Sequence, residues 1–116
     1  MPPLGGGSRN YDHPVSKSLL ERRLTEVSDR LKQLREELRV ADEQLTHFAD
    51  EADDARIRAL VSETPLAEQE HREAQKHADA MGRHRADVLA ELEALERTQD
   101  ELLDRLVAGS SPTGPT

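Results

Sequence analysis

The sequence predicts an all-α fold in which two long helices pair as an antiparallel coiled-coil hairpin, with disordered tails at the N- and C-termini. Three observations support this prediction. Apolar residues recur every seven positions through most of the chain, which is typical of coiled coils. Pro65 divides this pattern into two parts, because proline disfavours a helical conformation in the residue before it. Glycine, proline and serine are concentrated in the two terminal stretches.

The first tail is predicted over residues 1–15, where prolines and glycines leave too little apolar area to offset chain entropy. Ser16 is a favourable N-cap, and the first helix is predicted over 16–62. Two sets of heptad positions run along this helix. They are Leu24, Leu31, Leu38, Leu45, Ala52 and Ala59, and Leu20, Val27, Leu34, Ala41, Phe48 and Ala55. Together they predict a continuous apolar seam.

The second helix is predicted over 65–108, after a turn at 62–65. Thr64 is a favourable N-cap and Pro65 suits the first helical position, where its missing N–H would have no partner. Its heptad positions are Ala67, Ala74, Met81, Val88, Leu95 and Leu102, and His71, Ala78, Arg85, Leu92, Gln99 and Leu106. Gly109 stands where a C-cap glycine is expected, followed by a disordered tail over 109–116. The short break favours a hairpin, although the same heptads would serve a dimer that exchanges arms.

The composition excludes several classes of protein. The 116 residues include 24 acidic and 16 basic side chains, for a net charge of -8, and no cysteine. The acidic balance argues against direct nucleic-acid binding, and the missing cysteines exclude disulfides and thiolate metal sites. No apolar run approaches the ~20 residues of a membrane span. We therefore expect a cytoplasmic protein that binds neither nucleic acid nor membrane.

The sequence contains no pattern that indicates catalysis, a metal or a cofactor. A helical metal pair needs two histidines at i and i+4, but His71 and His77 are six residues apart and His77 and His84 are seven apart. No carboxylate pair is set in an apolar stretch that would make one of them an acid catalyst. No glycine-rich phosphate loop precedes a helix. We therefore expect a protein that is not an enzyme and has no cofactor.

Three heptad positions of the second helix are polar: His71, Arg85 and Gln99. The heptad register predicts that Leu45 and Leu31 face the last two. In the simpler interpretation, these side chains reach water beside a narrow two-helix seam and help to set the register. In the alternative interpretation, they line a site for a ligand or for a second hairpin.

Apolar and acidic residues outside the seam are the candidates for partner binding. Leu89 and Leu103 lie two heptads apart on one flank of the second helix, and we expect them to support association. Ile57, Leu60, Val61 and Leu66 surround the turn, with acidic Glu63 and Glu68 near them. The turn cluster would either close the hairpin end as a hydrophobic cap or bind a partner. The expected partner is another protein or a second copy, which would give a four-helix homodimer.

The leading functional hypothesis is a non-enzymatic coiled-coil interaction protein, acting as a scaffold, adaptor or regulatory subunit. A hairpin with an acidic turn also resembles, in architecture alone, the coiled-coil fingers of bacterial RNA-polymerase secondary-channel regulators. That resemblance implies a transcription regulator whose acidic tip, with Glu63 and Glu68, inserts into RNA polymerase. A third hypothesis is a small-ligand sensor that uses Arg85, Gln99 and the histidines.

Overall fold

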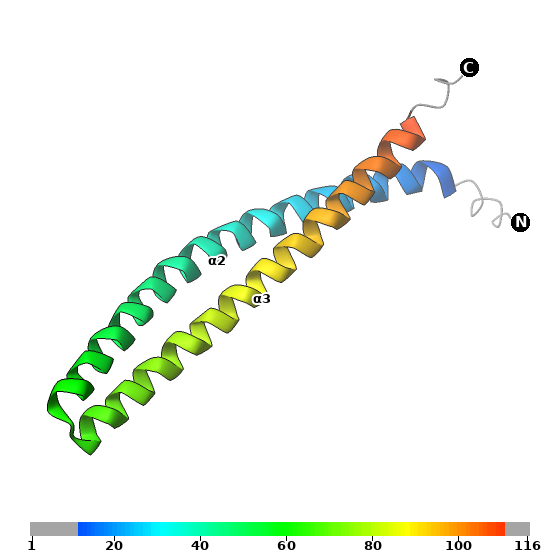
Figure 1. Ribbon diagram of the computed structural model, residues 1–116. Coiled ribbons are helices and arrows are strands. Elements are labelled where there is room, and N and C mark those ends of the chain that lie inside the picture. Colours follow the sequence, from blue (N-terminus) through cyan, green and yellow to red (C-terminus); the bar gives the residue numbers. More distant parts are fainter. Residues whose placement is uncertain (1–11, 111–116) are drawn as a thin grey trace, which may run out of the picture. The chain divides into compact units, whose positions relative to one another are not determined.

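The chain folds into two long helices joined by a short turn (Figure 1). The computed structural model describes the backbone of residues 12–110 and the side chains of residues 17–109. It contains α2 (Asp12–Ser62) and α3 (Pro65–Ser110), and no strand lies within 12–110. The predicted all-α hairpin of two long helices is therefore confirmed. The outer parts of the predicted tails, 1–11 and 111–116, lie outside the described residues.

Both helices extend beyond their predicted outer ends. Helix α2 begins at Asp12, so Ser16 lies inside the helix and the N-cap predicted there is wrong. Pro14 is compatible with this start, because the first N–H groups of a helix have no intrahelical partner. Helix α3 continues to Ser110, and no described glycine has a positive φ. Gly109 is therefore a helical residue and not the left-handed cap that the sequence suggested.

The chain divides into two compact units, which we describe separately. The turn unit is Gln33–Leu92 and contains the turn with the adjoining parts of both helices. The terminal unit is formed by Met1–Lys32 and Glu93–Thr116, of which 12–32 and 93–110 are described. In the turn unit, α2 and α3 lie side by side and run in opposite directions (Figure 1).

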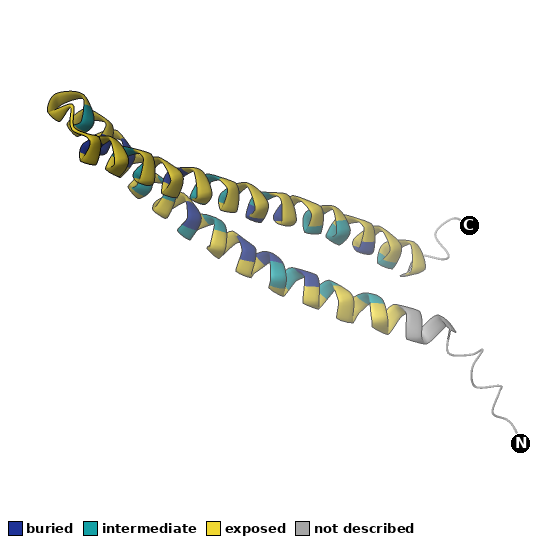
Figure 2. Ribbon diagram, turned by 90° about the horizontal axis from the view of Figure 1, so that it is seen from below, coloured by how far each residue is buried: buried dark blue, intermediate teal, exposed yellow. Residues whose placement is uncertain are grey.

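The predicted heptad seam forms the core in both units. The turn unit buries Leu34, Ala41, Ala52, Ala55, Ala67, Ala78, Val88 and Leu92, and the terminal unit buries Val27, Leu31 and Leu102. Every one of these buried residues occupies a predicted heptad position. No polar or charged residue is buried within 17–109. Figure 2 shows the buried positions recurring along the helices among mostly exposed residues.

The turn consists of two residues, each of which caps one helix. Glu63 has a φ of 54°, and its N–H donates to the carbonyl oxygen of Ala59 at 3.0 Å. This single bond from a left-handed residue is the αL motif that ends many helices. Thr64 accepts a 3.1 Å hydrogen bond from the N–H of Ala67 at its Oγ1, and a 3.1 Å bond from the N–H of Glu68 at its carbonyl oxygen. The predicted N-cap at Thr64 is therefore confirmed.

Across residues 12–110, neither helix carries an apolar stretch with the length and hydropathy needed to cross a bilayer.

Candidate functional site

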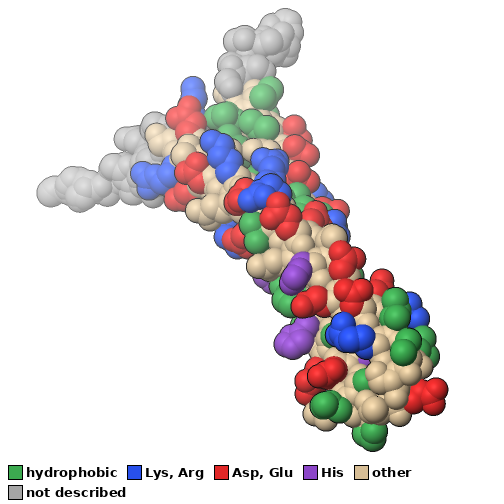
Figure 3. All heavy atoms as spheres, turned by 90° about the vertical axis from the view of Figure 1, so that its left-hand side faces the viewer, with side chains coloured by type: hydrophobic (Ala, Val, Ile, Leu, Met, Phe, Trp, Pro, Cys, Tyr) green, Lys and Arg blue, Asp and Glu red, His purple; other side chains and the backbone are tan. Residues whose placement is uncertain are grey.

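The most exposed apolar side chains of the turn unit surround the turn. Ile57, Leu60, Val61 and Leu66, which we call the turn surface, are between 51% and 79% exposed. Figure 3 shows hydrophobic side chains gathered at this end of the molecule, with acidic side chains beside them. Of the two interpretations of the turn cluster, the exposure of these side chains favours a partner surface over a hydrophobic cap. The turn is held by hydrogen bonds that the Glu63 N–H donates and that Thr64 accepts.

Acidic residues outnumber basic residues around the turn surface. Residues 50–73 contain eight Asp and Glu side chains against three Arg. Glu63 and Glu68, which the sequence singled out, are both exposed. Glu68 also lines an open hollow of about 250 Å³ with Leu60, His71 and two arginines, Arg56 and Arg72. The turn unit thus presents apolar side chains inside a predominantly acidic surround.

A larger hollow of about 530 Å³ lies between the helices of the turn unit. Its lining residues are Glu51, Asp54, Ala55, Arg58, Glu70, Glu73, Ala74 and His77. The four carboxylates are all exposed, so the hollow lacks the water-excluded setting in which carboxylates become acid–base catalysts. Within the described part of the chain, no three His, Cys, Asp or Glu side chains are arranged to hold a metal ion.

An aromatic contact crosses between the helices beside this hollow. The ring of Phe48 stacks on His77, with centroids 5.9 Å apart and planes inclined by 19°. On the other side, Phe48 makes a tilted contact with His47 at 5.7 Å, and His47 lies 3.6 Å from the Glu51 carboxylate. His77 therefore packs against an aromatic ring, and its contacts within 17–109 indicate a structural role.

Two of the three polar heptad positions, Arg85 and Gln99, make hydrogen bonds across the hairpin. In the turn unit, the Arg85 guanidinium donates to the Asp42 carboxylate. In the terminal unit, Gln99 Nε2 donates to Ser28 Oγ at 3.2 Å. Asp42 lies three residues before Leu45, which the register predicted opposite Arg85. Ser28 lies three residues before Leu31, which the register predicted opposite Gln99. Because polar residues on α2 engage Arg85 and Gln99, these contacts support the interpretation that the polar positions set the register.

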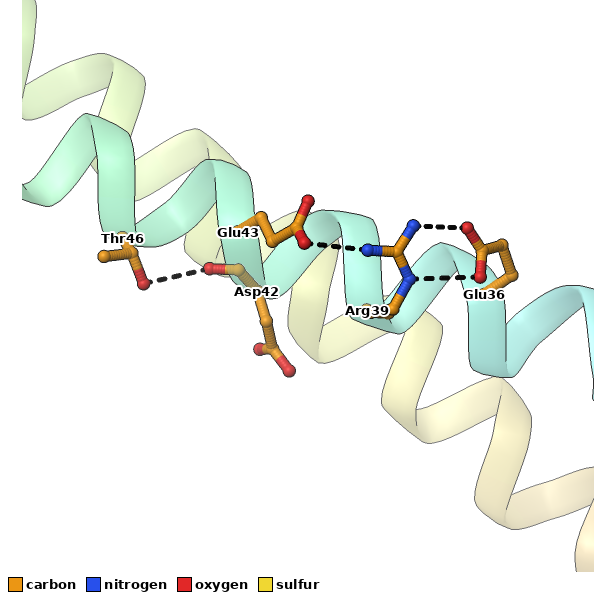
Figure 4. A network of polar contacts seen from close by, with 5 residues as sticks. All are labelled: Glu36, Arg39, Asp42, Glu43 and Thr46. Atoms are coloured by element: carbon orange, nitrogen blue, oxygen red, sulfur yellow. Dashed lines mark hydrogen bonds and ion pairs between the residues drawn. The ribbon is translucent and has the colours of Figure 1, made fainter.

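A separate ion-pair network lies on the surface of α2 (Figure 4). Arg39 donates to Glu36 at 2.6 and 3.1 Å and to Glu43 at 2.7 Å. The hydrogen bond and positive charge of Arg39 hold the pKa of Glu36 below its usual range, and the same contacts raise the pKa of Arg39. All three side chains are more than half exposed, so the network is a surface feature of the helix.

The two leucines predicted to form an association stripe have different environments. Leu89 belongs to the turn unit and is half-buried, whereas Leu103 belongs to the terminal unit and is 44% exposed. Leu89 therefore offers less surface for association than Leu103 does.

The terminal unit contains an apolar site that the sequence interpretation missed. Leu19, Leu20, Arg23, Leu102 and Arg105 line a hollow of about 240 Å³, which we call the leucine hollow. Leu19 is 51% exposed although it lies next to a heptad position. The adjacent leucines at 19 and 20 were a signal, since only one of two neighbours can face a seam.

Comparison of the chain with protein-family models, with characterised proteins and with solved structures finds no match.

Proposed function

We propose that this chain is a non-enzymatic helical-hairpin interaction protein that binds a protein partner through the turn surface. The observation that carries this proposal is the exposure of four large apolar side chains, Ile57, Leu60, Val61 and Leu66, at one end of the turn unit. Exposed apolar clusters rimmed by polar residues are characteristic of protein interaction sites. Three of the four residues are spaced i, i+3 and i+4 on α2, as in helices that dock into apolar grooves.

The turn geometry favours binding because it fixes this surface in advance. The hydrogen bonds of Glu63 and Thr64 cap both helices, so the backbone that carries the apolar side chains is already ordered. A preordered surface loses less conformational entropy when a partner binds. The exposed carboxylates of the larger hollow give no comparable support for catalysis.

The experiment that tests this proposal is site-specific crosslinking in the native cell. A photo-crosslinking amino acid at Leu60 should give an adduct with a defined protein. The adduct should disappear when Val61→Ser and Leu66→Ser are introduced in the same chain. The matched control places the crosslinker at exposed Thr46, on the same helix, where no adduct is expected. Equal adducts at both positions, or adducts unaffected by the serine substitutions, would contradict the proposal.

In the RNA-polymerase hypothesis, the carboxylates beside the turn surface are the groups that act on the partner. The exposure of Glu63 and Glu68 beside the turn surface is the observation that favours it. Glu63→Gln with Glu68→Gln removes these charges, while Ile57→Ser with Val61→Ser removes apolar area. Loss of RNA-polymerase binding and of its regulation in the charge variant alone would favour the regulator. Loss of partner binding in the apolar variant favours the interaction protein.

The small-ligand hypothesis predicts that a ligand raises the melting temperature, because binding to the folded form alone stabilises it. A thermal-shift screen of nucleotides and divalent metals tests this, with Arg85→Leu as the variant that should abolish the shift. The contacts of Arg85 with Asp42 and of Gln99 with Ser28 give a structural alternative for both side chains.

A further inference from the structure

The leucine hollow of the terminal unit combines an apolar floor with two guanidinium groups. Leu19, Leu20 and Leu102 form the apolar part, and Arg23 and Arg105 complete the lining. No ion pair joins either arginine to another residue within 17–109. Two unpaired guanidinium groups beside an apolar hollow would suit a ligand that presents an apolar side chain next to a carboxylate.

The turn surface presents this combination. Val61 is 79% exposed, the highest value among the large apolar residues of 17–109, and Glu63 follows two residues later at the turn. The Glu63 carboxylate makes no ion pair with the described residues. The hydrogen bond from the Glu63 N–H to the Ala59 carbonyl oxygen holds the left-handed backbone at Glu63, two residues after Val61.

The two regions also differ in the charges next to their apolar side chains. Residues 50–73, around the turn surface, have a net negative charge. In the terminal unit, residues 17–32 contain five Lys and Arg side chains against three Asp and Glu, whereas residues 93–110 contain two Arg against five Asp and Glu. The positive excess therefore belongs to the α2 segment, which supplies three of the five residues of the leucine hollow. The attraction available to an acidic turn surface is therefore that of the α2 segment and of the lining residues Arg23 and Arg105, whereas two acidic turn surfaces would repel each other.

We propose that the turn surface of one copy docks into the leucine hollow of a second copy, so that the chain associates head to tail. This inference rests on the proposed function, in that it names the partner of the turn surface. Val61 enters the leucine hollow, which at about 240 Å³ has room for one such side chain. Glu63 pairs with Arg23 and Arg105 at the rim.

Such a contact joins two different surfaces, so each copy keeps one turn surface and one leucine hollow available for further copies. The turn surface has four apolar residues, well below the ~20–30 residues per side of a stable interface. Association is therefore concentration-dependent, and it weakens with ionic strength because charge pairs contribute to it.

A mixing experiment with two non-associating variants tests this arrangement. One variant carries Val61→Ser with Glu63→Asn, since asparagine tolerates a left-handed backbone. The other carries Arg23→Ser with Arg105→Ser. All four positions are exposed, and circular dichroism should show unchanged helicity. We expect each variant alone to lose at least about tenfold in association constant, because a charge-assisted contact is removed.

A mixture of the two variants retains one intact contact, between the turn surface of one and the leucine hollow of the other. Light scattering on the mixture should therefore show a one-to-one complex that does not grow, whereas the unmodified chain forms larger species as concentration rises. The matched control, Arg22→Ser with Arg97→Ser, removes two exposed arginines of the same unit that do not line the hollow. It should associate like the unmodified chain.

Three results would overturn the head-to-tail contact. They are an unmodified chain that stays monomeric at all concentrations, variants that associate as well as the control, and a mixture that fails to pair. If the chain stays monomeric while the crosslinker at Leu60 captures a different protein, the proposed function stands and the second copy is the wrong partner. If both experiments give nothing, the proposed function fails as well.

Discussion

The part of the turn unit next to the turn and the terminal unit bury the same kind of heptad position with side chains of different size. Close to the turn, the buried positions are alanines: Ala52, Ala55, Ala67 and Ala78. In the terminal unit they are Val27, Leu31 and Leu102. Because hydrophobic stabilisation follows the apolar area removed from water, the alanine seam contributes less per residue. The part of the hairpin next to the turn therefore depends more on the backbone hydrogen bonds of its caps.

The two units also differ in the chemistry of their polar crossings. Arg85 and Asp42 form a charged pair in the turn unit, whereas Gln99 and Ser28 form a neutral hydrogen bond in the terminal unit. Arg85 and Gln99 are 14 residues apart on α3, and Asp42 and Ser28 are 14 residues apart on α2. The two crossings are therefore separated by two heptads on both helices. The spacing of the two crossings is the same on both helices, although one crossing is charged and the other is neutral. This indicates that the two crossings share a role in setting the register of the helices more than a role of charge.

The largest expected effect breaks the packing of a fully buried leucine. Leu34 in the turn unit has no exposed surface, and Leu31 in the terminal unit is 1% exposed. Replacing either by alanine removes buried methyl groups and leaves a cavity, so each substitution should lower the free energy of unfolding by about 2–5 kcal/mol. Urea denaturation followed by circular dichroism measures the change.

The control for this prediction is Leu60→Ala, because Leu60 is 65% exposed. We expect it to change the free energy of unfolding by less than about 0.5 kcal/mol. A comparable loss at Leu34 and Leu60 would show that the seam does not hold the turn unit together.

Because the buried positions close to the turn are alanines, larger side chains at these positions should lower the stability of the hairpin. Ala55→Leu inserts a larger side chain at a position that is 2% exposed, and overpacking should lower the free energy of unfolding by about 1–3 kcal/mol. Ala49→Leu, at an exposed position on the same helix, should be nearly neutral. Thermal unfolding of both variants makes the comparison. A stabilised Ala55→Leu variant would mean that the seam has room and that small side chains are not required there.

The heptad pattern predicted the core because the side-chain period of a helix is a local property of the sequence. Every buried residue lies at a predicted heptad position, and Thr64 caps α3 as its side chain suggested. Contacts on the flanks were harder to predict, because they depend on how far one helix is shifted along the other. The turn that joins the helices includes a left-handed residue at Glu63, which a glutamate does not signal.

The turn surface and the leucine hollow also differ in whether residues close together or far apart in the sequence form them. The turn surface was found from residues close together in sequence, such as Ile57 and Val61. The leucine hollow joins Leu19 and Arg23 of α2 to Arg105 of α3, and no local pattern links residues so far apart in the chain. For the same reason, Asp42 and Ser28 were not identified as partners of the polar heptad positions.

A smaller effect is expected at the turn, where Thr64 caps α3. Thr64→Ala removes the acceptor for the Ala67 N–H and should lower the free energy of unfolding by about 1 kcal/mol. Thr46→Ala is the control: the Thr46 hydroxyl donates to the Asp42 carbonyl inside the helix, and alanine there should be neutral or slightly stabilising. Chemical denaturation of both variants tests the difference. No loss in Thr64→Ala would show that water replaces the cap without cost.

The smallest effect concerns the two polar crossings, and it separates charge from register. Double-mutant cycles on Arg85 with Asp42, and on Gln99 with Ser28, measure the coupling free energy within each pair. The Arg85 and Asp42 side chains are 36% and 51% exposed, so their coupling should stay below about 1 kcal/mol and should decrease as salt is added. The Gln99–Ser28 coupling should be of similar size and independent of salt, because neither group is charged.

If both couplings fell together with salt, long-range charge would govern the two crossings. If the neutral pair kept its coupling while the charged pair lost it, the recurrence of the crossings every 14 residues would reflect register, with charge as a local addition in the turn unit.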